Sequence, residues 1–210
     1  MNKFLSIGNA LIITGAALLL ASGVWYLYNS AEDLKAEEAS ARLADQVKVE
    51  LSATAPSTSS ALFEDEAAAA GILGSEADGS NSLMVFDDEQ VDGLLSIPAI
   101  ELEMAVIDNW SEQNLKRSIC RYYGSSSTND FVIAGHNYKS GFGKLKHLSV
   151  GDSVYFTDMS GNVMAYEVAA IEVISGTDVP AMIKDGWDLS LFTCTYGGVD
   201  RLTVRCRLKA

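Results

Sequence analysis

Residues 189–208 read LSLFTCTYGGVDRLTVRCRL, and this stretch decides the fold. Two runs of alternating residues flank the segment YGGVD at 196–200. Alternation of this kind indicates β-strands, and Gly-Gly suits the positive φ angles of a tight hairpin turn. A turn centred on the two glycines places Cys194 directly opposite Arg201, where paired Cβ atoms lie about 4.5–5.5 Å apart.

The same alternation separates the two faces of the hairpin. One face is predicted to be core and carries Leu189, Leu191, Leu202, Val204, Cys206 and Leu208. The other face carries Phe192, Cys194, Arg201, Thr203 and Arg205. Because a nearby cation favours the nucleophilic thiolate form of a cysteine, this second face is the candidate reactive surface. A register slip of one residue would separate the thiol from the guanidinium.

The rest of the globular part follows the same β-rich pattern. A short helix is expected at Ser111–Ser118, with Ser111 as its cap. Further strands are predicted at Leu94–Pro98, Glu103–Val106, Phe131–His136, Ser153–Thr157, Val163–Ile174, Leu189–Thr195 and Arg201–Leu208. Seven short strands in this length, with few helices, favour a mainly β fold that is a closed or nearly closed barrel.

The N-terminal region predicts export. No charged residue occurs from Phe4 to Ala31, and an apolar run of this length suffices for a helix to cross a bilayer. Lys3 precedes the run and acidic residues follow it, so residues 1–8 are predicted to be cytoplasmic and residues 9–28 to form the transmembrane anchor. The alternative is a cleaved signal peptide, because small residues lie near Ala21. Both interpretations place the remainder outside the membrane.

The region between anchor and barrel is acidic. The chain of 210 residues has a net charge of −13, and residues 32–94 alone hold 15 acids and 3 bases. This charge argues against nucleic-acid binding. Residues 29–82 are interpreted as an extracellular stalk, helical up to residue 51 and flexible from 52 to 82, followed by a domain at 83–210.

The helical part of the stalk is predicted to be solvated. Leu34, Leu43 and Val47 give it only a partial apolar stripe. We therefore expect a passive spacer, so that removing residues 1–82 leaves the melting temperature unchanged.

The two histidines differ in their surroundings. His136 ends the apolar run Phe131–Gly135, where a strand emerges into a loop, whereas His147 lies in a basic, surface-like segment. On spacing alone either histidine has an ordinary structural interpretation. The cysteines and histidines lack the C-x-x-C spacing of zinc sites, so no metal site is predicted.

Several segments together resemble the sortase family. Residues 191–194 (LFTC) are similar to the family's cysteine signature, residues 134–137 (AGHN) to its histidine segment and residues 201–204 (RLTV) to its arginine strand. Residues 95–100 (LSIPAI) and 148–152 (LSVGD) resemble the opening strand and the segment that follows the histidine. The resemblance implies an eight-stranded barrel and a cysteine transpeptidase of Gram-positive cell surfaces, anchored in the membrane by one N-terminal helix.

The resemblance also implies roles for individual residues. Cys194 would be the nucleophile, His136 the proton-transfer group and Arg201 the transition-state arginine, although Arg205 and Arg207 compete for that last role. We further expect Asn137, Phe192 and Thr193 to contact the substrate.

The partners implied by the resemblance are surface proteins with an LPxTG-like sorting motif and an amine acceptor, from a peptidoglycan precursor or a pilin lysine. No cofactor is needed. A structural Ca²⁺ occurs in some relatives, but no acidic cluster in this sequence compels one. The subclass stays open, as do two other functions: a Cys-His hydrolase that passes the acyl group to water, and a non-enzymatic membrane-tethered β-domain.

Overall fold

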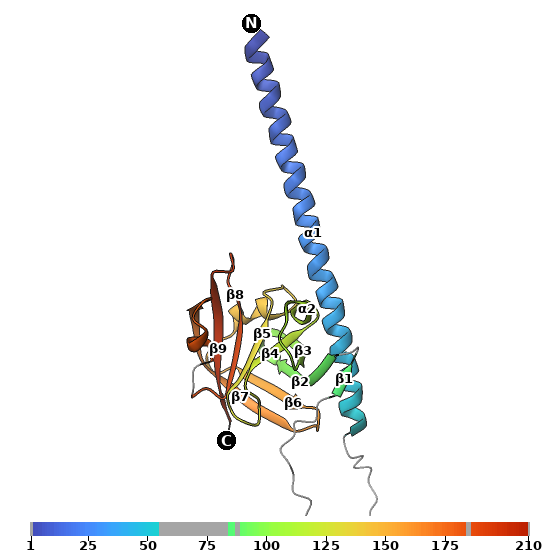
Figure 1. The fold of residues 1–210 in the computed structure, drawn as a ribbon, viewed down its shortest axis with the longest axis vertical. Helices are drawn as coiled ribbons and strands as arrows, with labels where there is room; N and C mark the ends of the chain where they lie inside the picture. The colour runs from blue at the N-terminus through green and yellow to red at the C-terminus, as the bar shows by residue number, and fades with distance from the viewer. Residues whose placement is uncertain (1, 55–83, 87–88, 184–185, 210) are drawn as a thin grey trace, which may run out of the picture.

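The computed structural model describes residues 2–54, 84–86, 89–183 and 186–209. A long helix, α1 (Asn2–Thr54), lies against a β-barrel (Figure 1). The shorter helices are α2 (Glu112–Leu115), α3 (Val179–Met182) and the 3-10 turns η1 (Pro98–Ile100) and η2 (Phe142–His147). The strands are β1 (Met84–Phe86), β2 (Glu89–Ile97), β3 (Leu102–Ile107), β4 (Ile119–Tyr123), β5 (Phe131–Gly135), β6 (Ser153–Asp158), β7 (Val163–Ser175), β8 (Leu189–Cys194) and β9 (Asp200–Leu208).

Eight of the nine strands in the described residues close into a barrel. The order β2-β3-β4-β5-β8-β9-β7-β6 returns to β2 through antiparallel pairing of β2 with β6, and β1 adds to β2 alone. At the closure, a Cβ on Gly93 would lie 2.1 Å from the carbonyl oxygen of Thr157, so only glycine permits this backbone approach. The predicted eight-stranded closed barrel is therefore confirmed.

All seven predicted strands are present, and the short helix is α2. The Oγ atom of Ser111 accepts a hydrogen bond of 3.0 Å from the backbone N–H of Asn114, as expected of a cap. Two strands were not predicted. β1 is three residues long, and β4 pairs in parallel with β3 at only two positions before a bulge disturbs its pairing with β5.

The barrel interior is a continuous apolar core. Phe131 and Phe156 meet edge to face in it with ring centroids 5.1 Å apart. The core includes Leu189, Leu191, Val204 and Cys206 as predicted, whereas Leu202 is half-buried and Leu208, at the strand end, is 43% exposed.

The opposite face of the β8–β9 hairpin is also largely covered, which the alternation did not indicate. Phe192, Thr203 and Arg205 are buried there. Phe192 belongs to a second apolar cluster with Met182 of α3 and Ile174 of β7. Helix α3 therefore covers part of this face.

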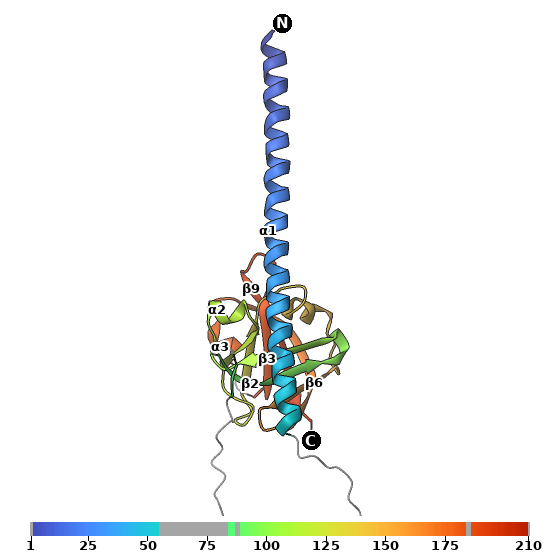
Figure 2. The same cartoon turned by 90° about the vertical axis from the view of Figure 1, so that its right-hand side faces the viewer.

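Helix α1 is not solvated along its second half, so that expectation is wrong. Leu43 and Val47 are buried in a third apolar cluster with residues of β2 and β3. Figure 2 shows this half of α1 lying across the barrel over β3. Lys48 also forms an ion pair of 2.8 Å with Glu103. The flexible stalk predicted at 52–82 falls almost wholly outside the described residues.

The docking stripe was missed because small residues form much of it. Ala36, Ser40 and Ala44 are buried together with Leu43 and Val47 at helical spacing. Small side chains let the helix approach closely, and the Ser40 and Ser118 hydroxyls come within 3.5 Å of each other. The docked helix therefore contributes to the stability of the barrel.

Leu43→Ala tests this contribution. Leu43 is 3% exposed, so the substitution should lower the free energy of unfolding by about 2 kcal/mol or more, measured by denaturant titration of the full chain in detergent micelles. Leu34→Ala makes the same change where the side chain is 66% exposed, and it should stay within about 0.5 kcal/mol. Equal effects of the two variants would contradict the docked arrangement.

Candidate active site

The candidate histidine leaves the barrel at the end of β5. All five residues of β5 are buried, and His136 follows as the first half-buried position. Gly135 permits this exit, because a Cβ there would lie 2.7 Å from the ring of Phe142 and 2.9 Å from Ile119. Phe142 of the η2 turn thus packs directly against the backbone of Gly135, the last residue of β5.

Parallel pairing brings the cysteine to the same edge. β5 and β8 pair with Gly135 opposite Thr193, so His136 and Cys194 emerge at adjacent positions. The Thr193 hydroxyl donates a hydrogen bond of 2.8 Å to the carbonyl oxygen of Gly135. Thr193 is 3% exposed, and this hydrogen bond joins the ends of β5 and β8.

Antiparallel pairing supplies the arginine. Cys194 of β8 lies opposite Arg201 of β9, in the predicted register. Gly197 and Gly198 have φ angles of 91° and 73°, which glycine adopts without strain. The Arg201 guanidinium donates to the carbonyl oxygens of Gly198, at 2.9 Å, and Asp200, at 3.1 Å. The turn carbonyls therefore hold the guanidinium of the residue that lies opposite Cys194 in the strand register.

The other two arginines of β9 have different surroundings. Arg205 is fully buried, and it donates to Glu172 at 2.7 Å, to Ser190 at 2.8 Å and to the carbonyl oxygens of the α3 segment. Arg207 is exposed and stacks on Trp187 at 4.4 Å from the ring centroid. Arg201 lines one cavity with Cys194 and His136, and in the described part of the chain neither Arg205 nor Arg207 lines that cavity.

That cavity, which we name the apolar cavity, has a volume of about 350 Å³. Its lining includes His136, Cys194 and Arg201 together with the aromatic residues Trp110, Tyr122 and Phe192. Tyr122 makes edge-to-face contacts with Phe192 at 5.1 Å and Trp110 at 6.1 Å. Phe192 thus lines the cavity, as expected of a substrate contact. Sequence reasoning missed Tyr122 because β4 was not predicted, and it missed Trp110, which lies between β3 and α2.

Cys194 also lines a second cavity, which we name the basic cavity. Its volume is about 340 Å³, and Asn137 lines it beside Cys194. Its remaining lining includes Lys139, Lys144, Lys146, His147 and Tyr196. Cys194 therefore lines both an apolar cavity and a cationic one.

Burial distinguishes the titratable groups of the site. Burial lowers the pKa of the His136 imidazole below 6.5, while Glu112 acts in the opposite direction and Lys116 in the same one. His136 Nε2 is buried and has no hydrogen-bond partner among the residues that the structure describes. Burial raises the pKa of Cys120 and of Cys206 to about 12, so these two thiols are unreactive at neutral pH. Cys194 is the one half-exposed thiol, and all three cysteines are free.

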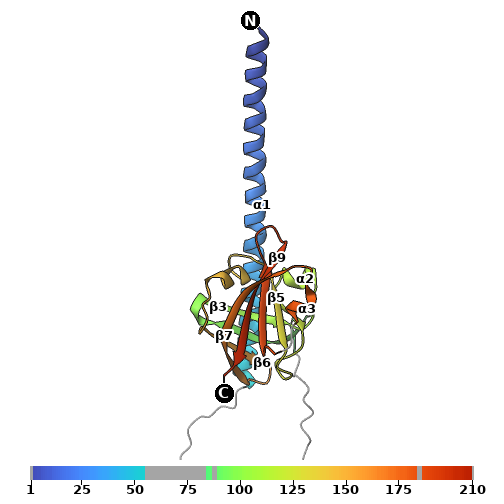
Figure 3. The same cartoon turned by 90° about the vertical axis from the view of Figure 1, so that its left-hand side faces the viewer.

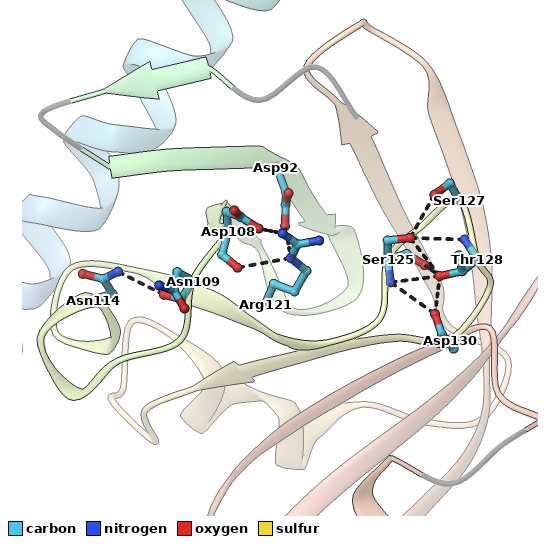
Figure 4. Close-up of polar contacts among 9 residues, drawn as sticks. All are labelled: Asp92, Asp108, Asn109, Asn114, Arg121, Ser125, Ser127, Thr128 and Asp130. Carbon is cyan, nitrogen blue, oxygen red and sulfur yellow. Dashed lines mark hydrogen bonds and ion pairs between the residues drawn. The ribbon is translucent and has the colours of Figure 1, made fainter. Parts of the chain in front are cut away.

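Acidic residues near the barrel end pair with arginine. Figure 4 shows Arg121 between Asp92 and Asp108, with Arg121 Nε 3.2 Å from an Asp92 carboxylate oxygen. Figure 4 also shows Asp130 bonded within the turn of Ser125 and Thr128. Within the described ranges, no group of three or more His, Cys, Asp or Glu side chains is arranged to hold a metal ion.

Comparison with known proteins agrees with this arrangement. The family description "Sortase domain" matches residues 95–209, more than half of the chain. The chain belongs to the sortase family. This stretch contains every barrel strand except the first part of β2, and it contains His136, Cys194 and Arg201.

Individual relatives are moderately similar to this sortase. Sortase A of Bacillus anthracis is 29% identical over 114 residues, 51% of this chain and 54% of that protein. Sortase A from Corynebacterium diphtheriae is 26% identical with a TM-score of 0.52, over 58% of this chain and 62% of that one. Sortase C of Clostridium perfringens, solved with the C-terminal cell wall sorting motif, is 26% identical with a TM-score of 0.51, over 57% and 71%. The chain thus spans about half the length of the curated relative.

The burial of the thiols predicts selective labelling. A maleimide reagent at neutral pH should modify one thiol per native chain and three after denaturation, as counted by intact mass spectrometry. Cys194→Ala should abolish native labelling. Native labelling that survives this substitution would contradict the burial of Cys120 and Cys206.

The depressed pKa of His136 predicts its titration. In a His147→Gln variant the remaining imidazole signal should titrate by NMR with a midpoint below 6.5. Because the folded state then binds the proton more weakly than the unfolded state, stability should fall as the pH drops below about 6.5. A midpoint at or above 6.5 would show that His136 is not desolvated.

Proposed function

We propose that this sortase is a membrane-anchored cysteine transpeptidase that cleaves a sorting motif and transfers the acyl group to an amine. The observation that carries the proposal is that β5, β8 and β9 bring His136, Cys194 and Arg201 to one barrel edge around one cavity. A thiol, an imidazole and a guanidinium in this arrangement suit acyl transfer. The relative from Clostridium perfringens was solved with a C-terminal sorting motif, which supports a substrate of that kind.

The first half-reaction forms a thioester. The Cys194 thiolate attacks the carbonyl carbon of the scissile peptide bond, and Arg201 donates hydrogen bonds to the developing oxyanion. The C–N bond then breaks, and the leaving amine takes a proton from the His136 imidazolium. The apolar cavity would hold the side chains of the sorting motif, with Phe192 as part of its wall.

The second half-reaction restores the enzyme. An incoming amine gives a proton to His136 and attacks the thioester carbonyl, so that a C–N bond forms and the C–S bond to Cys194 breaks. We propose that this amine enters through the basic cavity, where Asn137 offers a hydrogen-bonding side chain. The acceptor would be a peptidoglycan-precursor amine or a pilin lysine.

Membrane anchoring rests on the N-terminal half of α1. Large apolar side chains from Leu11 to Tyr28 are 62–76% exposed, and this half of α1 extends away from the barrel (Figure 1). A helix that is apolar on all sides and long enough to span the hydrocarbon layer suits a bilayer. We propose residues 9–28 as the anchor, residues 1–8 on the cytoplasmic side and the domain at 83–210 on the outside.

Product analysis tests the reaction. The full chain, incubated with an LPxTG-type peptide and triglycine, should give a peptide–triglycine product by mass spectrometry, and Cys194→Ala should reduce its yield at least about a thousandfold. A product carrying only water, at saturating amine, would instead indicate a hydrolase. Absence of cleavage across a peptide library would favour a non-enzymatic domain.

The three arginines of β9 provide matched variants. Arg201→Lys keeps the charge but loses the planar fork, so kcat/KM should fall about a hundredfold or more with the melting temperature retained. Arg205→Lys should lower the melting temperature, because it removes buried hydrogen bonds. Arg207→Lys should change neither. Loss of activity in a fully folded Arg205→Lys variant, with Arg201→Lys silent, would overturn the assignment.

A further inference from the structure

Helix α1 passes from its apolar half to the barrel without a break. It is one continuous helix from Asn2 to Thr54. Ala36 and Ser40 of α1, together with His136 and Tyr138, line a cavity of about 440 Å³. Ala36 lies eight residues after Tyr28, which is about 12 Å along a helix axis. The histidine end of the barrel therefore lies close to the end of the apolar segment.

The β8–β9 turn projects from that same end. Figures 1 to 3 all show this loop rising beyond the barrel toward the N-terminal end of α1. The β7–β9 register agrees, since Ser175 pairs with Asp200 at the turn, while Tyr166 pairs with Leu208 near the other end. The start of β7 at Val163, and the C-terminus, lie at the end away from the turn.

The side chains of the turn suit a lipid headgroup layer. Tyr196 is 89% exposed and Val199 is 73% exposed. Tyrosine side chains favour the membrane–water boundary, where the ring is in apolar surroundings and the hydroxyl meets water. Tyr196 also borders the basic cavity with Lys139 and Lys146, which are exposed cations in a chain of net charge −13. Lysines at a membrane surface are attracted to anionic lipids.

We propose that the β8–β9 turn, through Tyr196 and Val199, docks into the outer headgroup layer of the bilayer that α1 spans. This inference rests on the proposed anchoring by residues 9–28. The rigid helix sets the height and direction of the barrel, and the turn makes the second contact. Cys194 and Arg201 stand at the two ends of this turn, so docking places the reacting groups at the membrane surface.

A single fluorescent label tests the docking. Val199→Cys in the Cys194→Ala chain is labelled with the environment-sensitive probe NBD, and the buried Cys120 and Cys206 stay unlabelled. The full chain is reconstituted in vesicles of phosphatidylcholine and phosphatidylglycerol that contain shallow doxyl-lipid quenchers. Val163→Cys, at a valine that is 63% exposed at the opposite barrel end, is the matched control.

We expect a blue-shifted emission and at least about twofold stronger quenching at position 199 than at 163. Adding Tyr196→Ser should weaken the quenching at 199. Equal emission and quenching at the two positions, in a chain that floats with the vesicles, would overturn the docking and leave the anchor intact. A blue shift that requires a sorting-motif protein would assign the turn to that partner and overturn lipid docking. Failure of the chain to float would refute the anchor and the docking together.

Discussion

The active-site arrangement depends on how β8 pairs with its two neighbours. On one side, parallel pairing with β5 aligns Gly135 with Thr193, so the residues that follow are His136 and Cys194, the proposed catalytic pair. On the other side, a glycine turn folds β9 back so that Arg201 faces Cys194. No single loop sets this geometry. It follows from the hydrogen bonds of three adjacent strands, and the Thr193–Gly135 bond joins the two parallel strands at their ends.

Features that depend on local sequence were predictable, and features that depend on tertiary packing were not. Centring the turn on Gly197 and Gly198 was enough to predict the register of β9 against β8 correctly. Ser111 correctly predicted the start of α2 as its N-terminal cap. β4 was not predicted from the sequence, and its pairing with β3 covers only two positions. The burial of the outer face of the hairpin was not predicted, because an arginine such as Arg205 is usually exposed. In the structure, Glu172 and the carbonyl oxygens of α3 enclose its guanidinium. Charge in a sequence does not reveal whether partners will enclose it.

The packing of α1 on the barrel contradicts the expectation of a solvated, passive spacer before the barrel. A pattern based on large apolar residues suggested a solvated helix, but alanine and serine complete the buried stripe at Ala36, Ser40 and Ala44. Small residues contribute little apolar area each, yet they let a helix lie close to a sheet. The helix therefore transmits a fixed orientation to the barrel, which a flexible spacer would not do. Under the proposed anchoring by residues 9–28, the position of Cys194 relative to a bilayer follows from the fold.

The central claim is that Cys194 carries the acyl group between the two substrates. The most direct measurement is intact-protein mass spectrometry of the full chain, quenched in acid soon after mixing with an LPxTG-type peptide and no amine. The account predicts a covalent adduct with the mass of the N-terminal peptide fragment. Digestion should map it to Cys194, and triglycine added before the quench should discharge it. Turnover of the peptide with no adduct at any time, or an adduct on another residue, would contradict the account.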